Sequence, residues 1–271
     1  MRRGLSGINL AALTLGFAFL YIPILLLIIF SFNESKLVTV WAGFSTKWYV
    51  AMVENALLLD AAWMTLKVAV VSSTVALVLG TLAGIALARL GRFPGRTLFS
   101  GMVYAPLVMP EVITGLSMLL LFVALSWARG YWTVTVAHIT FSMAYVAVVV
   151  QSRLLTMDRS LEEAAMDLGA PPVKTFFAVT LPIISPALVA GWLLAFTLSL
   201  DDLVIASFTS GPGSTTLPMK IYSQVRLGVT PEINAVSTVL VGIVSIGVIA
   251  ASLINKRAMV IREREAQAAD P

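Results

Sequence analysis

The chain consists of long apolar runs separated by shorter polar segments. Six runs with few or no charged residues cover positions 8–32, 68–88, 98–127, 130–151, 184–208 and 233–255. Each run is close to or above the roughly 20 residues that a helix needs to cross the hydrocarbon core of a bilayer. Because none of them alternates between apolar and polar positions, they are not the strands of a membrane barrel. The pattern predicts an all-α membrane protein in which one transmembrane domain, residues 1–271, contains six helices.

The composition excludes several classes of protein. Hydrophobic residues make up 59% of the chain and charged residues only 12%. That is about half the charged share of an ordinary soluble domain, which excludes a disordered chain and a soluble enzyme. The chain has 0 cysteines, so disulfides, thiolate metal sites and cysteine nucleophiles are excluded as well.

The basic residues predict the orientation in the membrane. With the N-terminus placed in the cytoplasm, 12 of the 18 Lys and Arg residues fall in cytoplasmic segments and 6 in outside segments. Short cytoplasmic loops of membrane proteins carry such an excess of positive charge. We therefore expect both termini in the cytoplasm. The same asymmetry accounts for the net charge of +4, which gives no indication of nucleic-acid binding.

Two loops on the expected outer side are long. The first, residues 33–61, contains Trp41 and Trp48, and residues 45–55 within it are expected to form a short helix at the membrane surface. The second, residues 209–232, is rich in glycine and proline. Aromatic anchoring in the headgroup layer and contact with a soluble partner outside the membrane both fit these loops.

The loop of residues 152–183 carries the signals of a short cytoplasmic helix. Ser160 followed by Glu163 fits a capping box at a helix start. Gly169 suits the position just after the helix end, and Pro171 prevents continuation. A short helix that is capped at both ends by its own sequence suits insertion into a cleft of another protein. The alternative is a helix resting on lipid, which its acidic residues disfavour on an anionic leaflet.

The same loop resembles the signature of ABC-importer permeases. That signature is Glu-Ala-Ala, three residues, Gly, nine residues, Ile, one residue and Leu-Pro. The matching residues are Glu163, Ala164, Ala165, Gly169, Leu181 and Pro182, with Val179 in the place of the isoleucine. Segments 93–96, 105–111, 199–202 and 228–235 resemble the polyamine branch of this family, in particular the second permease subunits of bacterial putrescine importers.

The resemblance implies an ABC type I importer permease fold and an assembly in the bacterial inner membrane. In such an assembly, a periplasmic binding protein delivers substrate to a heterodimer of this chain with a second permease subunit. Two cytoplasmic ATPase subunits then drive transport. The residues implied in coupling to the ATPase are Ser160, Glu163, Ala164, Ala165, Gly169, Leu181 and Pro182.

The chain itself has no sequence for binding ATP. No Gly-x-x-x-x-Gly-Lys-Ser/Thr loop occurs, and the nearest segment, residues 91–97, is one residue short and lacks the lysine. We therefore expect a transport subunit rather than an enzyme, with no cofactor of its own and with ATP bound by the partner subunits.

Three acidic residues lie inside the expected helices: Glu111, Asp201 and Asp202. A carboxylate in mid-bilayer costs at least about 2.5 kcal/mol, and no Lys or Arg of this chain is expected at the same depth. A cationic polyamine would supply the missing charge along a substrate path. For Glu111, which follows Pro110, support of a broken helix or pairing with the other permease is an equal alternative. Adjacent helical residues point about 100° apart, so we expect only one aspartate to face the path.

Two further features have structural interpretations. His138, the only histidine, is expected to be packed or hydrogen-bonded rather than a metal ligand, because no second ligand is in view. Gly80 and Gly84 are spaced for close packing between helices. We expect no metal site.

The resemblance thus implies the permease subunit of an ATP-driven, binding-protein-dependent importer that moves a polyamine, with putrescine the expected substrate. Two alternatives stay open. One is a permease of the same family for spermidine or another small substrate. The other, less favoured, is an ion-coupled secondary transporter, which explains the buried acids but leaves the capped cytoplasmic helix without a purpose.

Overall fold

The computed structural model describes residues 7–37, 40–228, 230–247 and 249, and this part of the chain is helical throughout apart from its loops. Its contacts divide the chain into two compact units, residues 57–222 and residues 1–56 with 223–271, which are described separately. The labelled elements are α1 (Gly7–Ser31), α2 (Lys47–Glu54), α3 (Ala56–Arg89), α4 (Arg96–Val108), α5 (Glu111–Ala124), α6 (Tyr131–Thr156), α7 (Ser160–Asp167), α8 (Pro172–Thr175), a π-helix η1 (Phe176–Thr180), α9 (Leu181–Asp201), α10 (Val204–Thr209) and α11 (Leu217–Leu227).

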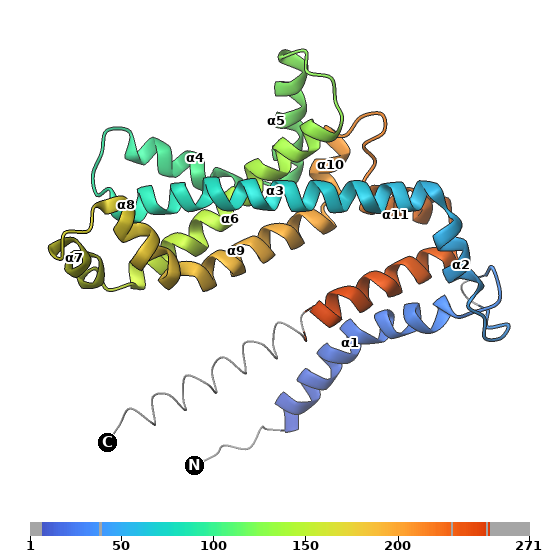
Figure 1. Cartoon of the computed structure of the whole chain (residues 1–271). Coiled ribbons are helices and arrows are strands. Elements are labelled where there is room, and N and C mark those ends of the chain that lie inside the picture. The colour runs from blue at the N-terminus through green and yellow to red at the C-terminus, as the bar shows by residue number, and fades with distance from the viewer. Residues whose placement is uncertain (1–6, 38–39, 229, 248, 250–271) are drawn as a thin grey trace. The chain divides into compact units, whose positions relative to one another are not determined.

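Three long helices form the core of residues 57–222. Helices α3, α6 and α9 contribute side chains to one buried apolar cluster, and they run alongside one another in Figure 1. Two glycines of α3 permit a close approach to α6. A Cβ atom at Gly80 would lie 2.7 Å from the carbonyl oxygen of Met143, and one at Gly84 would lie 3.0 Å from that of Ala147. The predicted close packing at these two glycines is confirmed.

The run expected as one helix over residues 98–127 is a bent pair. Helix α4 ends at Val108, α5 begins at Glu111, and the two are bent by 117°. Pro110 accounts for the break, because proline lacks an N–H donor and disfavours helical geometry in the residue before it. Met109 is accordingly extended, with a ψ of 137°. The structure therefore replaces a single continuous helix with two shorter ones.

The run expected over residues 184–208 is also interrupted. Helix α9 ends at Asp201, Asp202 is extended with a ψ of 122°, and the short α10 follows from Val204. Figure 1 shows α7 and α8 at one end of residues 57–222, away from α5 and α10.

The candidate membrane spans agree in part with the predicted six. Four helices of the described part of the chain are long and apolar enough to cross a membrane, and the bent pair α4–α5 is a possible fifth span. The sixth run begins with the apolar helix Pro231–Gly247, and most of its remainder, residues 248 and 250–255, lies outside the described residues. The number six and the orientation of the termini stay predictions.

In the other unit, hydrogen bonds hold the described part of the loop between α1 and α2. The side-chain amide of Asn33 donates hydrogen bonds to the carbonyl oxygens of Leu37 and Val40. The indole of Trp48 in turn donates to the carbonyl oxygen of Asn33 at 2.7 Å. The short helix predicted within residues 45–55 is confirmed as α2, whereas its place at the membrane surface stays a prediction.

Candidate functional site

A cleft of about 440 Å³ borders both helix breaks. It is lined by Pro106, Leu107, Met109, Pro110, Glu111, Thr114, Phe141, Tyr145, Leu198, Asp201, Asp202, Leu203, Val204 and Ile205. The three acids that the sequence singled out, Glu111, Asp201 and Asp202, are all among them. No Lys or Arg belongs to this lining, so no basic side chain of the lining neutralises these acids.

The two breaks explain why the acids meet. Glu111 is the first residue of α5, directly after the Pro110 break, and Asp201 is the last residue of α9. Both are exposed at the surface of the chain. Phe141 and Tyr145, one turn apart on α6, add aromatic faces to the same lining. Carboxylates beside aromatic rings form a suitable environment for a cation with an apolar body.

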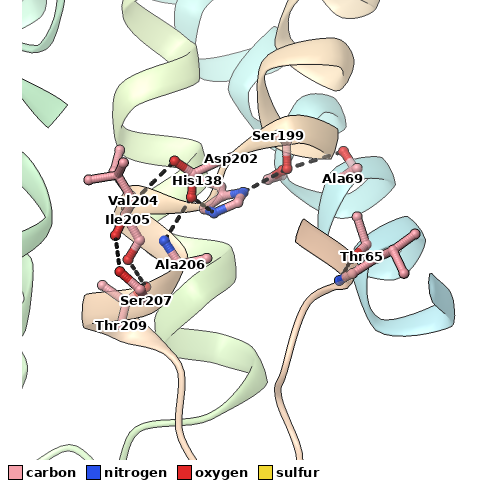
Figure 2. Close-up of polar contacts among 12 residues, drawn as sticks. Thr65, Ala69, His138, Ser199, Asp202, Val204, Ile205, Ala206, Ser207 and Thr209 are labelled. Carbon is pink, nitrogen blue, oxygen red and sulfur yellow. Dashed lines mark hydrogen bonds and ion pairs between the residues drawn. The ribbon is translucent and has the colours of Figure 1, made fainter. Parts of the chain in front are cut away.

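Asp202 differs from Asp201 in its surroundings. It is only 9% exposed, and its carboxylate accepts hydrogen bonds from the backbone N–H groups of Ile205 at 3.2 Å and Ala206 at 2.7 Å. An aspartate that accepts these bonds caps the start of a helix, here α10. Figure 2 shows the Asp202 side chain directed towards this helix. Both aspartates line the cleft, so the expectation that only one of them faces a substrate path stays a prediction.

His138 belongs to a buried polar chain next to the cleft. Its Nδ1 lies 2.7 Å from Oγ of Ser199, which accepts a hydrogen bond from Ser72 of α3 at 3.1 Å. Its Nε2 lies 3.2 Å from Oδ2 of Asp202, within ion-pair distance but without hydrogen-bond alignment. Figure 2 shows His138 between Ser199 and Asp202. The expected hydrogen-bonded role of His138 is confirmed, and the described residues contain no group of three potential metal ligands.

At the other end of this unit, the start of α7 differs from the predicted capping box. Arg159 stands at the N-cap position with helical angles and without a side-chain capping bond, so Ser160 is already the first residue of the helix. Instead, Oδ1 of Asp158 accepts the N–H of Ser160 at 3.0 Å, so the side chain of Asp158 caps the start of α7. Hydrogen bonds from the Ser160 N–H and hydroxyl hold the pKa of Asp158 below its ordinary value of 3.8. The capping-box prediction was wrong by two residues, because two competent caps stand close together in the sequence.

The end of α7 follows the prediction. Gly169 has a φ of +85°, which glycine adopts without strain. Its N–H donates to the carbonyl oxygen of Met166 at 2.8 Å, and the N–H of Ala170 donates to the carbonyl oxygen of Ala165 at 3.1 Å. These two bonds form a Schellman motif. The helix therefore ends just before Gly169, as the sequence predicts. Leu168, directly before this glycine, is 90% exposed.

The remaining predicted coupling residues lie around this helix. Glu163 and Ala164 are exposed and Ala165 is half-buried, while Leu181 and Pro182 form the first turn of α9. Sequence reasoning missed Glu162, which contacts both α3 and the end of η1. The family signature directs attention to its neighbour Glu163, and nothing in the local sequence indicates that Glu162 makes these contacts.

Comparison with known proteins identifies the family. Residues 76–262 match the model described as "Binding-protein-dependent transport system inner membrane component". The chain belongs to this family. It is a permease component of the inner membrane, it does not itself hydrolyse ATP, and ATP is handled by partner ATPases.

Curated relatives cover nearly the whole chain. The putrescine transport system permease protein PotI of Escherichia coli (strain K12) is 56% identical over 267 residues, covering 96% of this chain and 95% of PotI. The spermidine/putrescine transport system permease protein PotC of the same organism is 44% identical over 240 residues, covering 89% of this chain and 90% of PotC.

Solved structures support the fold. A bacterial ABC transporter involved in the import of the acidic polysaccharide alginate matches with a TM-score of 0.70 at 16% identity, covering 92% of this chain and 94% of that chain. An amino acid ABC transporter matches with a TM-score of 0.57 at 18% identity, covering 77% of this chain and 98% of that chain. The fold is thus that of ABC-transporter membrane subunits, and family membership implies ATPase and binding-protein partners.

Proposed function

We propose that this chain is a permease subunit of an ATP-driven importer of putrescine and that it pairs with a second, different permease subunit. The observation that carries the proposal is the cleft in which Glu111 and Asp201 stand exposed without a basic residue in the lining. Similarity to PotI over 96% of the chain supports the same substrate.

The chemistry of the cleft fits a diamine. Putrescine carries two ammonium groups joined by a short apolar chain, and the cleft offers two exposed carboxylates and the rings of Phe141 and Tyr145. A carboxylate without a partner is costly at membrane depth, and a passing cation lowers that cost. Asp202 already accepts two backbone hydrogen bonds, so we assign the attraction of substrate to Glu111 and Asp201.

We further propose six spans with both termini in the cytoplasm. This arrangement puts α7 on the cytoplasmic side, where the exposed Glu163, Ala164 and Leu168 are accessible to an ATPase subunit. Ser160, Gly169 and the Leu181–Pro182 turn then shape the docking helix and its connection to α9.

One alternative is tested together with the proposal. A spermidine permease would use the same cleft, and similarity to PotC supports it. The ion-coupled transporter that the sequence left open is excluded, because membership of the permease family implies ATPase partners.

Uptake measurements test the role of the acids. Cells that lack the gene are supplied with the unaltered protein or a variant at matched membrane levels. Uptake of labelled putrescine or spermidine is then measured. We expect Asp201→Asn and Glu111→Gln each to slow putrescine uptake about tenfold, equivalent to about 1.4 kcal/mol, without loss of ATPase subunits. Asp202→Asn keeps a capping oxygen and should cause a smaller loss.

Asp60→Asn serves as the matched control, because Asp60 is exposed and lies outside the cleft lining. It should leave uptake unchanged. Normal uptake in Asp201→Asn, Glu111→Gln and the double variant would contradict the proposed role of the cleft. Faster uptake of spermidine than of putrescine by the unaltered protein would favour the spermidine alternative.

A further inference from the structure

The carboxyl end of α3 is held by arginines from two other elements. Nη2 of Arg96, at the start of α4, donates to the carbonyl oxygen of Leu87 at 2.8 Å. Nη2 of Arg159, just before α7, donates to that of Ala88 at 3.1 Å. Both interactions satisfy carbonyl groups that a helix end leaves without partners. Both also place a positive charge at the carboxyl end of α3, where the helix dipole is negative.

Glu162 of α7 joins this end of α3 to the beginning of α9. Its Oε2 lies 3.2 Å from Nη2 of Arg89, the last residue of α3, and the two side chains are only 17% and 16% exposed. Its Oε1 accepts a hydrogen bond from the hydroxyl of Thr180 at 2.6 Å. Thr180 is the last residue of η1, directly before α9. Both carboxylate oxygens of Glu162 are therefore engaged, each with a different element.

The adjacent glutamate has a different environment. Glu163 is exposed, whereas Glu162 is partly buried. Since successive helical residues point about 100° apart, one glutamate faces the body of the unit and the other faces away from it. A helix of eight residues is too short to hold its position by its own hydrogen bonds, so contacts of this kind determine where it stands.

We propose that Glu162 and Arg89 form an internal latch that makes α7 move together with α3 and α9. This inference rests on the proposed docking of an ATPase subunit at α7. Movement imposed on α7 then reaches α9 through Glu162 and Thr180, and α9 carries Asp201 at its far end. A helix of 21 residues spans about 30 Å, so one continuous helix links the docking helix to the cleft.

Charge reversal on both sides of the latch tests the proposal. In the purified complex with its ATPase subunits, we expect Arg89→Glu and Glu162→Arg each to lower the putrescine transported per ATP hydrolysed at least about fivefold, equivalent to about 1 kcal/mol. ATPase subunits should still co-purify, because the exposed face of α7 is unchanged. The double variant Arg89→Glu/Glu162→Arg restores opposite charges and should regain most of the transport per ATP. Recovery stays incomplete because arginine cannot accept the hydrogen bond from Thr180.

Arg92→Glu is the matched control. It reverses an equal charge in the same cytoplasmic segment, where Arg92 is exposed, and should leave transport per ATP unchanged. Three outcomes would overturn the latch: normal coupling in both single variants, no recovery in the double variant, or loss of the ATPase subunits from the single variants. The last outcome would assign Glu162 to docking instead.

A second measurement does not depend on substrate. Amide hydrogen exchange of residues 160–168 in the purified complex should accelerate in each single variant and slow again in the double variant. If the unaltered complex takes up no putrescine, the proposed substrate is wrong, yet this exchange pattern still decides whether the latch exists. Unchanged exchange in the single variants would overturn it.

Discussion

Asp201 and Asp202 are neighbours in the sequence but differ in what compensates their charge. Asp202 is buried and receives two backbone N–H groups at the start of α10, with His138 at ion-pair distance. Partners of this kind offset the cost of burying a carboxylate. Asp201 is exposed at the cleft. Of the two, Asp201 is therefore the residue with charge available to a ligand.

The sequence singled out these acids but gave no indication of the groups that they contact. Acids stand out in a membrane helix because the bilayer disfavours them. Whether one of them caps a helix depends on where α9 ends, and the apolar run itself continues through Asp202 without a stop signal. The hydrogen bond of His138 to Ser199 could not be predicted from the sequence either, because the two residues are 61 positions apart in the chain.

Exchange measurements at α7 test the corrected helix start. We expect Asp158→Ala to accelerate amide exchange in the first turn of α7 several-fold, because the N–H of Ser160 loses its acceptor. Ser160→Ala removes only a hydroxyl that donates to Asp158 and should have a smaller effect. A larger effect of Ser160→Ala would restore the capping box that the sequence suggested.

The same cap predicts a dependence on pH. The pKa of Asp158 is lower in the folded protein than its ordinary value of 3.8 because of its bonds to Ser160. Because this pKa is lowered, the ionised Asp158 stabilises the folded helix fully above about pH 4, the ordinary aspartate pKa. That stabilisation is lost as the pH falls through the lower pKa that Asp158 has in the folded protein. Exchange of the first turn should therefore accelerate on acidification below this range. Asp158→Asn, which has no charge to lose, should show no such acceleration, and a matching acid response in that variant would contradict the assignment.

At the scale of the elements, the cleft exists because two apolar runs are broken. The α4–α5 break at Pro110 presents Glu111, and the α9–α10 break presents Asp201. The apolar content of the sequence predicted both runs. It does not reveal whether a run forms one straight helix or two helices separated by a break. Proline marked the first break in the sequence. The second break has no proline and depends on contacts of Asp202 that only the folded chain provides.

Helix α6 contributes Phe141 and Tyr145 to the cleft, and its packing against α3 can be tested at Gly80. A Cβ atom there would lie 2.7 Å from both the carbonyl oxygen of Met143 and Cβ of Val146. We expect Gly80→Ala to destabilise the folded protein by about 1–3 kcal/mol, because helix backbones must separate to admit the methyl group. Denaturant unfolding in mixed micelles measures the change.

Gly101 of α4 provides the control for this substitution. No atom within 4 Å would meet a Cβ there, and alanine favours a helix over glycine by about 1 kcal/mol. Gly101→Ala should therefore be neutral or stabilising. Equal destabilisation at Gly80 and Gly101 would show that helix propensity, rather than the contact between α3 and α6, controls the result.

At the scale of the whole molecule, the bent pair decides the topology. If α4 and α5 cross the membrane together, the chain has the expected alternation and α7 is cytoplasmic. If the pair re-enters and returns to the side where it began, α6 starts in the cytoplasm and α7 lies outside. Charge favours the crossing, since Arg153, Arg159 and Lys174 flank α7 while Arg129 stands alone before α6.

Reporter fusions at four glycines distinguish the two topologies. With six spans, a reporter after Gly95 should be cytoplasmic, one after Gly130 periplasmic, one after Gly169 cytoplasmic and one after Gly213 periplasmic. A re-entrant α4–α5 pair leaves the first result unchanged and reverses the other three. An enzyme active only in the periplasm and a fluorescent protein that matures only in the cytoplasm should give opposite signals at each site, which guards against misfolded fusions. Because ATPase subunits reach only the cytoplasmic face, a periplasmic signal after Gly169 would also remove α7 as their docking helix, together with the coupling role proposed for it.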